Sequence, residues 1–146
     1  MRRCHFLFIL LLLLCGCNHI ESSSSLSSSD LRRLRDIHLL DSNEKVYKFY
    51  SEATKDVAGN FYTDRRMASY WIDRREKSRN EVNYAFYPDI VSLDTVYYAG
   101  ASYSPYMLVT KKDGEQFKVC ADGSHEEIKA FFEGALKMWK EKRDLR

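Results

Sequence analysis

The stretch SHEEIKAFFEGALKMWKEK, residues 124–142, carries the clearest structural signal in this sequence. Ser124 and Glu127 have the spacing of a capping box, in which the serine caps the first turn and the glutamate reaches back to it. Apolar residues then recur at helical spacing from Ile128 to Trp139, and basic residues gather at the end, where cations suit the helix dipole. The pattern predicts an amphipathic helix of about 18 residues whose apolar face packs on a core.

The chain from Asn43 to Asp122 consists instead of short segments rich in β-branched and aromatic residues, each closed by turn residues. The strongest turn signal is Asp113-Gly114, a dipeptide typical of a hairpin between two strands. We predict seven strands: Lys45–Ser51, Ala58–Thr63, Arg66–Asp73, Glu81–Phe86, Ile90–Tyr98, Pro105–Lys111 and Gln116–Ala121. The expected fold class is therefore α+β, mostly antiparallel, with one helix at the C-terminal end.

About seven short strands followed by one amphipathic helix is the element order of the pleckstrin-homology (PH) superfold. The segment FYTDRRMASY, residues 61–70, resembles a strand of bacterial PH-like and GRAM-like domains, and YPDIVSL, residues 87–93, is similar to a second segment of those families. The resemblance covers roughly Asn43 to Lys142. It implies a half-open β-barrel whose open end is plugged by the helix, with Trp139 in the core.

The N-terminus has the form of a secretory leader. Two arginines precede an apolar run from Phe6 to Leu14, which is shorter than the roughly 20 residues that span a bilayer but suits the apolar region of a signal peptide. The run ends at Leu14-Cys15-Gly16-Cys17, which resembles a bacterial lipobox. This resemblance implies a signal peptide over residues 1–16 and acylation of Cys17, with chains such as palmitate. The alternative is an ordinary signal peptide that leaves Cys17 as a free thiol.

Cleavage before Cys17 would remove Arg2 and Arg3 and leave 21 basic and 21 acidic side chains. Such a balance excludes nucleic-acid binding driven by net charge. Apart from Cys17, only Cys120 would remain, so we expect no intramolecular disulfide. Strand alternation leaves Cys120 partly exposed, either as an inert half-buried thiol or as one that can be oxidised.

Two further segments separate the leader from the strands. Residues 17–30 are rich in serine and have no core-forming pattern, so they are predicted to be a flexible tether. Asp30 can cap a short helix within residues 31–42, whose apolar side would carry Leu34. The PH-like domain would then span residues 43–146.

No pattern for catalysis or metal binding emerges. The histidines are scattered, the carboxylates occur singly, and no Gly-rich phosphate loop or nucleophile motif is present. We therefore expect no catalytic residue, no metal site and no cofactor, and we do not expect an enzyme.

Two groups of residues are candidates for an interaction surface. One group is basic and flanks a predicted strand, where it could face anionic lipid headgroups or simply protect a solvated strand edge: Arg65, Arg66, Arg74 and Arg75. The other is aromatic and gathers around Gly100 and Pro105, where it could bind a partner protein or pack on the barrel: Tyr97, Tyr98, Tyr103 and Tyr106.

These features favour a non-enzymatic protein, anchored by lipid in the bacterial cell envelope, whose PH-like domain binds or scaffolds an envelope protein. The alternative is a small-ligand or lipid-handling lipoprotein with a cavity between the sheet and the helix Ile128–Trp139. Asn18 is not the aspartate that often retains lipoproteins at the inner membrane, which favours the outer membrane. The oligomeric state is not predicted.

Overall fold

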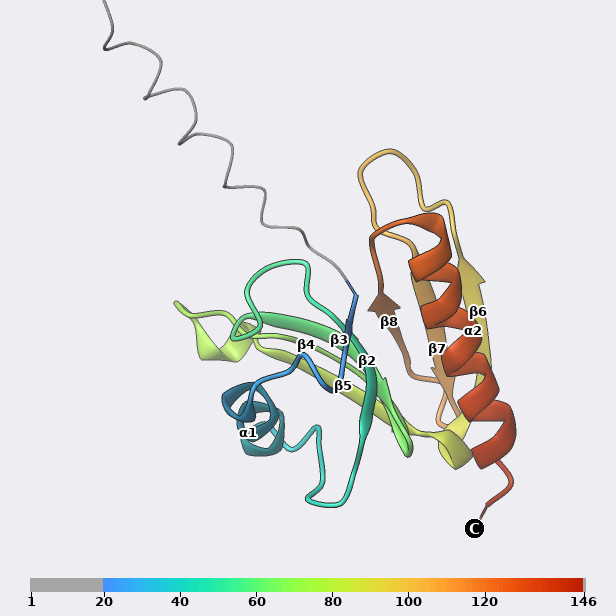
Figure 1. Ribbon diagram of the computed structural model, residues 1–146, viewed down its shortest axis with the longest axis horizontal. Helices are drawn as coiled ribbons and strands as arrows, with labels where there is room; N and C mark the ends of the chain where they lie inside the picture. The colour runs from blue at the N-terminus through green and yellow to red at the C-terminus, as the bar shows by residue number, and fades with distance from the viewer. Residues whose placement is uncertain (1–19, 146) are drawn as a thin grey trace, which may run out of the picture.

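The computed structural model describes residues 20–145, so the predicted leader and Cys17 lie outside the described residues. The elements, in chain order, are β1 (Glu21–Ser22), α1 (Ser28–Asp36), β2 (Val46–Tyr50), β3 (Ala58–Thr63), β4 (Arg66–Trp71), η1 (Lys77–Arg79), β5 (Glu81–Phe86), η2 (Tyr87–Asp89), β6 (Ile90–Val96), β7 (Tyr106–Lys111), β8 (Gln116–Cys120) and α2 (His125–Lys142) (Figure 1). All seven predicted strands and the C-terminal helix are therefore confirmed, with strand ends that differ by two residues at most.

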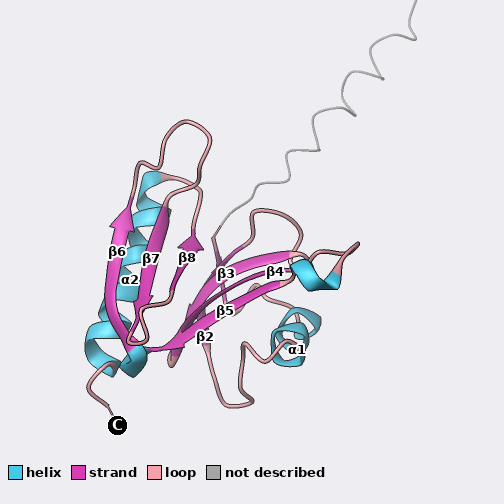
Figure 2. Ribbon diagram, turned by 180° about the vertical axis from the view of Figure 1, so that it is seen from behind, coloured by secondary structure: helices cyan, strands magenta, loops and turns pink. Residues whose placement is uncertain are grey.

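The strands form two antiparallel sheets. Five strands pair in the order β1-β2-β3-β4-β5, and three pair in the order β6-β7-β8. Figure 2 shows the two sheets opening away from each other, with α2 alongside the smaller one. The ring of Phe131 in α2 packs edge-on against Tyr62 of β3, with centroids 5.2 Å apart, so the helix closes the space between the sheets. The fold is α+β, as predicted.

One core lies between the two sheets and α2. The apolar stripe of the helix is buried in it, and Trp139 is partly buried and donates a hydrogen bond from Nε1 to the Ile90 carbonyl, 3.2 Å away. Phe131, Phe132 and Ala135 are completely buried against the sheets. This close packing counts against a ligand cavity between the sheet and the helix.

A second core lies on the other face of the five-stranded sheet, where the N-terminal segment packs. Leu34 of α1, together with Leu39 and Leu40 just after it, is buried against side chains of β2, β3 and β4. Figure 1 shows α1 and α2 on opposite sides of this sheet. The middle of the five-stranded sheet, from β2 to β4, is therefore packed against protein on both faces.

The Ser-rich segment is not the flexible tether that its composition predicts. Glu21 and Ser22 pair with β2 as strand β1, and the backbone N–H of Ser25 then donates to the Ser22 carbonyl in a turn. After this turn, Leu26 is buried in the second core. A single buried leucine among serines carries no periodic signal, which is why the pattern suggested a linker.

The short helix also begins earlier than predicted. Ser27 is the N-cap: its hydroxyl accepts from the Asp30 N–H at 3.1 Å, while the Asp30 carboxylate accepts from the Ser27 N–H at 3.0 Å. Asp30 is thus the third helical residue and not the cap. The helix ends at Asp36, and His38 adopts a left-handed conformation (φ 60°) that turns the chain back towards the sheet.

Replacing Leu34 by alanine should lower the free energy of unfolding by about 2–5 kcal/mol, because the side chain is 1% exposed in the second core. Arg32→Ala, on the exposed side of the same helix, is the matched control and should change it by less than about 0.5 kcal/mol. Urea denaturation followed by tryptophan fluorescence measures both variants. Equally small effects would show that α1 is not an integral part of the fold.

Candidate functional site

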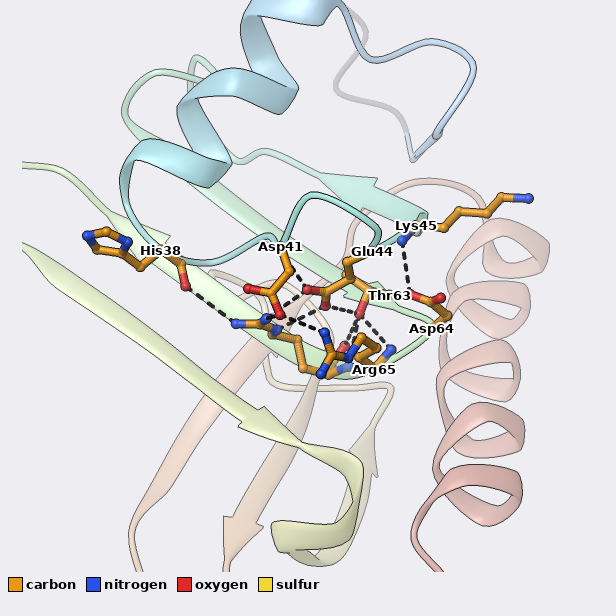
Figure 3. A network of polar contacts seen from close by, with 8 residues as sticks. His38, Asp41, Glu44, Lys45, Thr63, Asp64 and Arg65 are labelled. Carbon is orange, nitrogen blue, oxygen red and sulfur yellow. Dashed lines mark hydrogen bonds and ion pairs between the residues drawn. The ribbon is translucent and has the colours of Figure 1, made fainter. Parts of the chain in front are cut away.

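Two of the predicted surface arginines lie where the chain passes from β3 to β4: Arg65 is in the turn, and Arg66 is the first residue of β4. Only Arg65 is exposed. Arg66 is 2% exposed, which corrects the expectation that it lies on an accessible basic edge. Its guanidinium binds the buried Glu44 carboxylate at two points, with Nε 2.9 Å from Oε1 and Nη2 2.7 Å from Oε2. Figure 3 labels Glu44 within this network of polar contacts. Arg66 can be buried because the Glu44 carboxylate, from the N-terminal segment, compensates its charge.

Neighbouring groups complete the hydrogen bonding of this pair. The Thr63 hydroxyl donates to Glu44 Oε1 at 2.5 Å and accepts from the backbone N–H groups of Arg65 and Arg66, each at 2.9 Å. Asp41 adds a second carboxylate, 2.9 Å from Arg66 Nη2. Within the described residues, no buried side-chain nitrogen or oxygen lacks a partner. Removing only one partner of such a buried ion pair destabilises the fold strongly, because the other charge stays buried without a counter-charge.

Arg66 also positions the aromatic side chains of β5. Its guanidinium carbon lies 4.4 Å from the ring centroid of Phe86 and 5.2 Å from that of Tyr84, both within cation–π range. The register places Arg66 directly opposite Phe86 across the β4–β5 pair. Glu44, in the N-terminal segment, is thereby linked through Arg66 to the outer face of β5.

Strand β5 ends the five-stranded sheet, and among residues 20–145 no strand pairs with its outer edge. Val82 and Tyr84 are 40% and 42% exposed on its outer face. The strand contains no lysine, arginine or proline, and its pairing with β4 has no bulge. Natural edge strands usually carry such features to prevent pairing with other chains. The edge of β5 is therefore open to an added strand.

The other face of β5 borders a groove between the two sheets. A cavity of about 560 Å³ lies between β5 and the β7–β8 hairpin. It continues into a second cavity of about 350 Å³, which shares the lining residues Asn83, Gln116 and Phe117. The groove thus runs along the inner side of the open edge.

Polar side chains form the floor of this groove. The register aligns Asn60, Ser69 and Asn83 across β3, β4 and β5. Asn60 is buried, and its Oδ1 accepts a hydrogen bond from the Cys120 N–H at 2.9 Å, which ties β3 to β8. At one end of the groove Trp71 is exposed. These residues carry no signal in the sequence, because only the strand pairing brings them into one row.

Cys120 lines the groove and is partly buried, as strand alternation predicts. Burial raises the pKa of its thiol to about 11. The thiol is therefore protonated at neutral pH and is a weak nucleophile. This favours the interpretation of Cys120 as an inert residue.

The predicted arginines do not form one surface. Arg74 and Arg75 lie in the β4–β5 loop, at the opposite end of the sheet from Arg65 and Arg66. Arg74 forms an ion pair with Asp56 of the β2–β3 loop, whereas Arg75 is exposed without an ion pair in the described chain.

The four predicted tyrosines divide into two pairs. Tyr97 and Tyr106 are partly buried: the Tyr97 ring lies 5.1 Å from that of Phe132, and Lys118 Nζ lies 4.4 Å from the Tyr106 centroid. Tyr98 and Tyr103 project from the loop between them and are 89% and 74% exposed. Two of the four therefore hold the ends of the β6–β7 loop, and the other two are accessible.

The described part of the chain contains no cluster of side chains that could bind a metal ion: over residues 20–145, no three His, Cys, Asp or Glu side chains gather closely enough. Over the same residues, no helix combines the length and the apolar character that crossing a membrane requires.

The sequence matches no protein-family model and no curated protein. Among solved structures, the chain is similar to a DUF1696 family protein with a pleckstrin-homology domain from Shewanella loihica PV-4. The TM-score is 0.51 at 12% sequence identity, over 86% of this chain and 98% of that chain. This chain has a PH-like fold. The resemblance noted in the sequence is thus confirmed for the fold, and the groove beside β5 is a feature of this PH-like domain.

Replacing Glu44 by glutamine should lower the free energy of unfolding by about 3–5 kcal/mol, because it leaves the buried Arg66 guanidinium without its main counter-charge. Glu76→Gln removes an exposed pair with Arg79 and should cost less than about 1 kcal/mol. Chemical denaturation of both variants gives the comparison. A Glu44→Gln protein as stable as the control would contradict the importance given to this pair.

Proposed function

We propose that this protein is a non-enzymatic, lipid-anchored component of the bacterial cell envelope, and that its PH-like domain binds an extended segment of an envelope protein along β5. The lipobox-like sequence at Leu14–Cys17 supports the lipid anchor. Position 18 is asparagine and not aspartate, which supports location at the outer membrane. The PH-like fold supports a binding role. The unpaired edge of β5, a strand without lysine, arginine or proline, is the observation that supports this binding mode.

The two faces of β5 define the chemistry of the segment that would bind. Six edge residues match an extended segment of about 20 Å. An added strand takes main-chain hydrogen bonds from the edge, and its side chains alternate between the two faces. On the outer face they would contact Val82 and Tyr84, while on the inner face they would lie over the groove near Asn83 and Gln116. The expected ligand therefore alternates apolar and polar residues.

The anchor is tested by the intact mass of the protein extracted from membranes. The wild type should begin at Cys17 and carry acyl chains, and Cys17→Ala should lose both the chains and the membrane association. A single chain binds a membrane only marginally, so stable anchoring requires at least two. A protein with an uncut leader, or one cut elsewhere and not acylated, would contradict the anchor.

The β5 site is tested by photo-crosslinking in cells from a photoreactive phenylalanine at Tyr84. We expect one adduct with an envelope protein, and Val82→Lys should reduce its yield about tenfold by placing a charge in the apolar row. Val91→Lys is the matched control, because Val91 is also an exposed valine on an edge strand, β6.

Three results of this crosslinking experiment would contradict the proposed site. The first is the absence of any adduct, and the second is an adduct that both lysine variants reduce equally. The third is an adduct with the mass of two copies of this chain, which would assign the edge to self-association. Thermal unfolding of both lysine variants verifies that they are folded.

A further inference from the structure

We infer that the β6–β7 loop, residues 97–105, rests on the lipid headgroup layer and contacts it through Tyr98 and Tyr103. This inference rests on the lipid anchor of the proposed function and adds which end of the domain faces the membrane. Four observations carry it: the length of chain after Cys17, the position of the loop, its lack of charge and the exposure of its tyrosines.

The chain between the anchor and the fold is short. Strand β1 begins at Glu21, so only three residues separate Cys17 from the sheet. Fully extended, the chain from Cys17 to Ile20 reaches about 10 Å, which is close to the thickness of one headgroup layer, about 5–8 Å. The Ser-rich residues follow β1 and add no length. Acyl chains on Cys17 would therefore hold the start of β1 against the membrane surface.

The β6–β7 loop lies at this same end of the molecule. Glu21 pairs with Phe49 near the end of β2, and its carboxylate lies 2.6 Å from Lys55 Nζ in the β2–β3 loop. Glu52 of the β2–β3 loop lines a cavity of about 400 Å³ together with residues 99 and 102–104. Figures 1 and 2 both show the β6–β7 loop at the end of the molecule where β1 begins.

The loop has the composition of a surface that contacts lipid. From Tyr97 to Tyr106 the sequence is YYAGASYSPY, which contains no charged residue. Burying this loop in headgroups therefore requires no charge to be desolvated. Tyr98 and Tyr103 are 89% and 74% exposed, and tyrosine is enriched at membrane interfaces because its ring is apolar and its hydroxyl polar.

The partly buried tyrosines give the loop a fixed base. Tyr97 packs on Phe132 of α2, and the Tyr106 ring stacks with Lys118 of β8. The exposed Tyr98 and Tyr103 therefore lie in a loop whose two ends are packed against the domain. Because the contact relies on aromatic rings and not on a basic pocket, it should be independent of the headgroup charge.

The test uses the full, acylated chain reconstituted in vesicles of phosphatidylethanolamine and phosphatidylglycerol that contain brominated phosphatidylcholine. A fluorescent label is placed at Ser102→Cys, in a Cys120→Ser background. The matched control is a label at Lys112→Cys, in the β7–β8 hairpin at the other end of β7. The bromine should quench the label at position 102 at least about twofold more than the label at position 112, and Tyr98→Ser with Tyr103→Ser should remove this difference.

The outcomes separate this inference from the anchor itself. Equal quenching at both positions, in a sample whose mass shows an acylated Cys17, overturns the membrane contact and leaves the anchor intact. A sample without acyl chains and without quenching overturns both. A contact made by tyrosines should give the same quenching in vesicles of phosphatidylcholine alone. Quenching that is seen only when phosphatidylglycerol is present would therefore overturn the assignment to the tyrosines.

Discussion

The buried ion pair between Glu44 and Arg66 is the interaction on which the rest of the structure depends. It joins three parts of the chain: the segment after α1, the start of β4, and, through the stacked guanidinium, the aromatic face of β5. Two charges removed from water are tolerated only when all their hydrogen bonds are satisfied, and Thr63 and Asp41 meet that requirement. The N-terminal segment is therefore a structural part of the domain and also sets the shape of its open edge.

The sequence predicts those parts of the fold whose signals are local. Helix α2 has a capping box and a wide apolar stripe, and each strand of the two sheets lies between recognisable turn residues. The Ser-rich segment was wrongly predicted to be a flexible tether. Its structure depends on a single buried leucine, Leu26, and on pairing with β2, which is distant in the sequence. The burial of Arg66 was missed for a similar reason, since its partner lies 22 residues away.

The candidate site was predictable only in part. The cluster of tyrosines was visible in the sequence, but which members are exposed depends on contacts of Tyr97 with α2 and of Tyr106 with β8. The polar row Asn60, Ser69 and Asn83 follows from the register of three strands. Once the strands had been assigned, pairing neighbouring strands through their turns would have aligned these residues. That the edge of β5 is unpaired could not be predicted in this way, because it depends on the order of all the strands in the sheet.

Under the proposed acylation of Cys17, the start of β1 only four residues further along the chain would limit how far this domain can reach from the membrane. A compact domain of this length has a radius of gyration of about 14 Å, so its whole body would occupy only a thin layer next to the bilayer. A lipoprotein on a long tether samples a hemisphere of the periplasm, whereas this one would move as a particle confined to a plane. Its encounters would then be restricted to proteins that present a segment close to the same membrane.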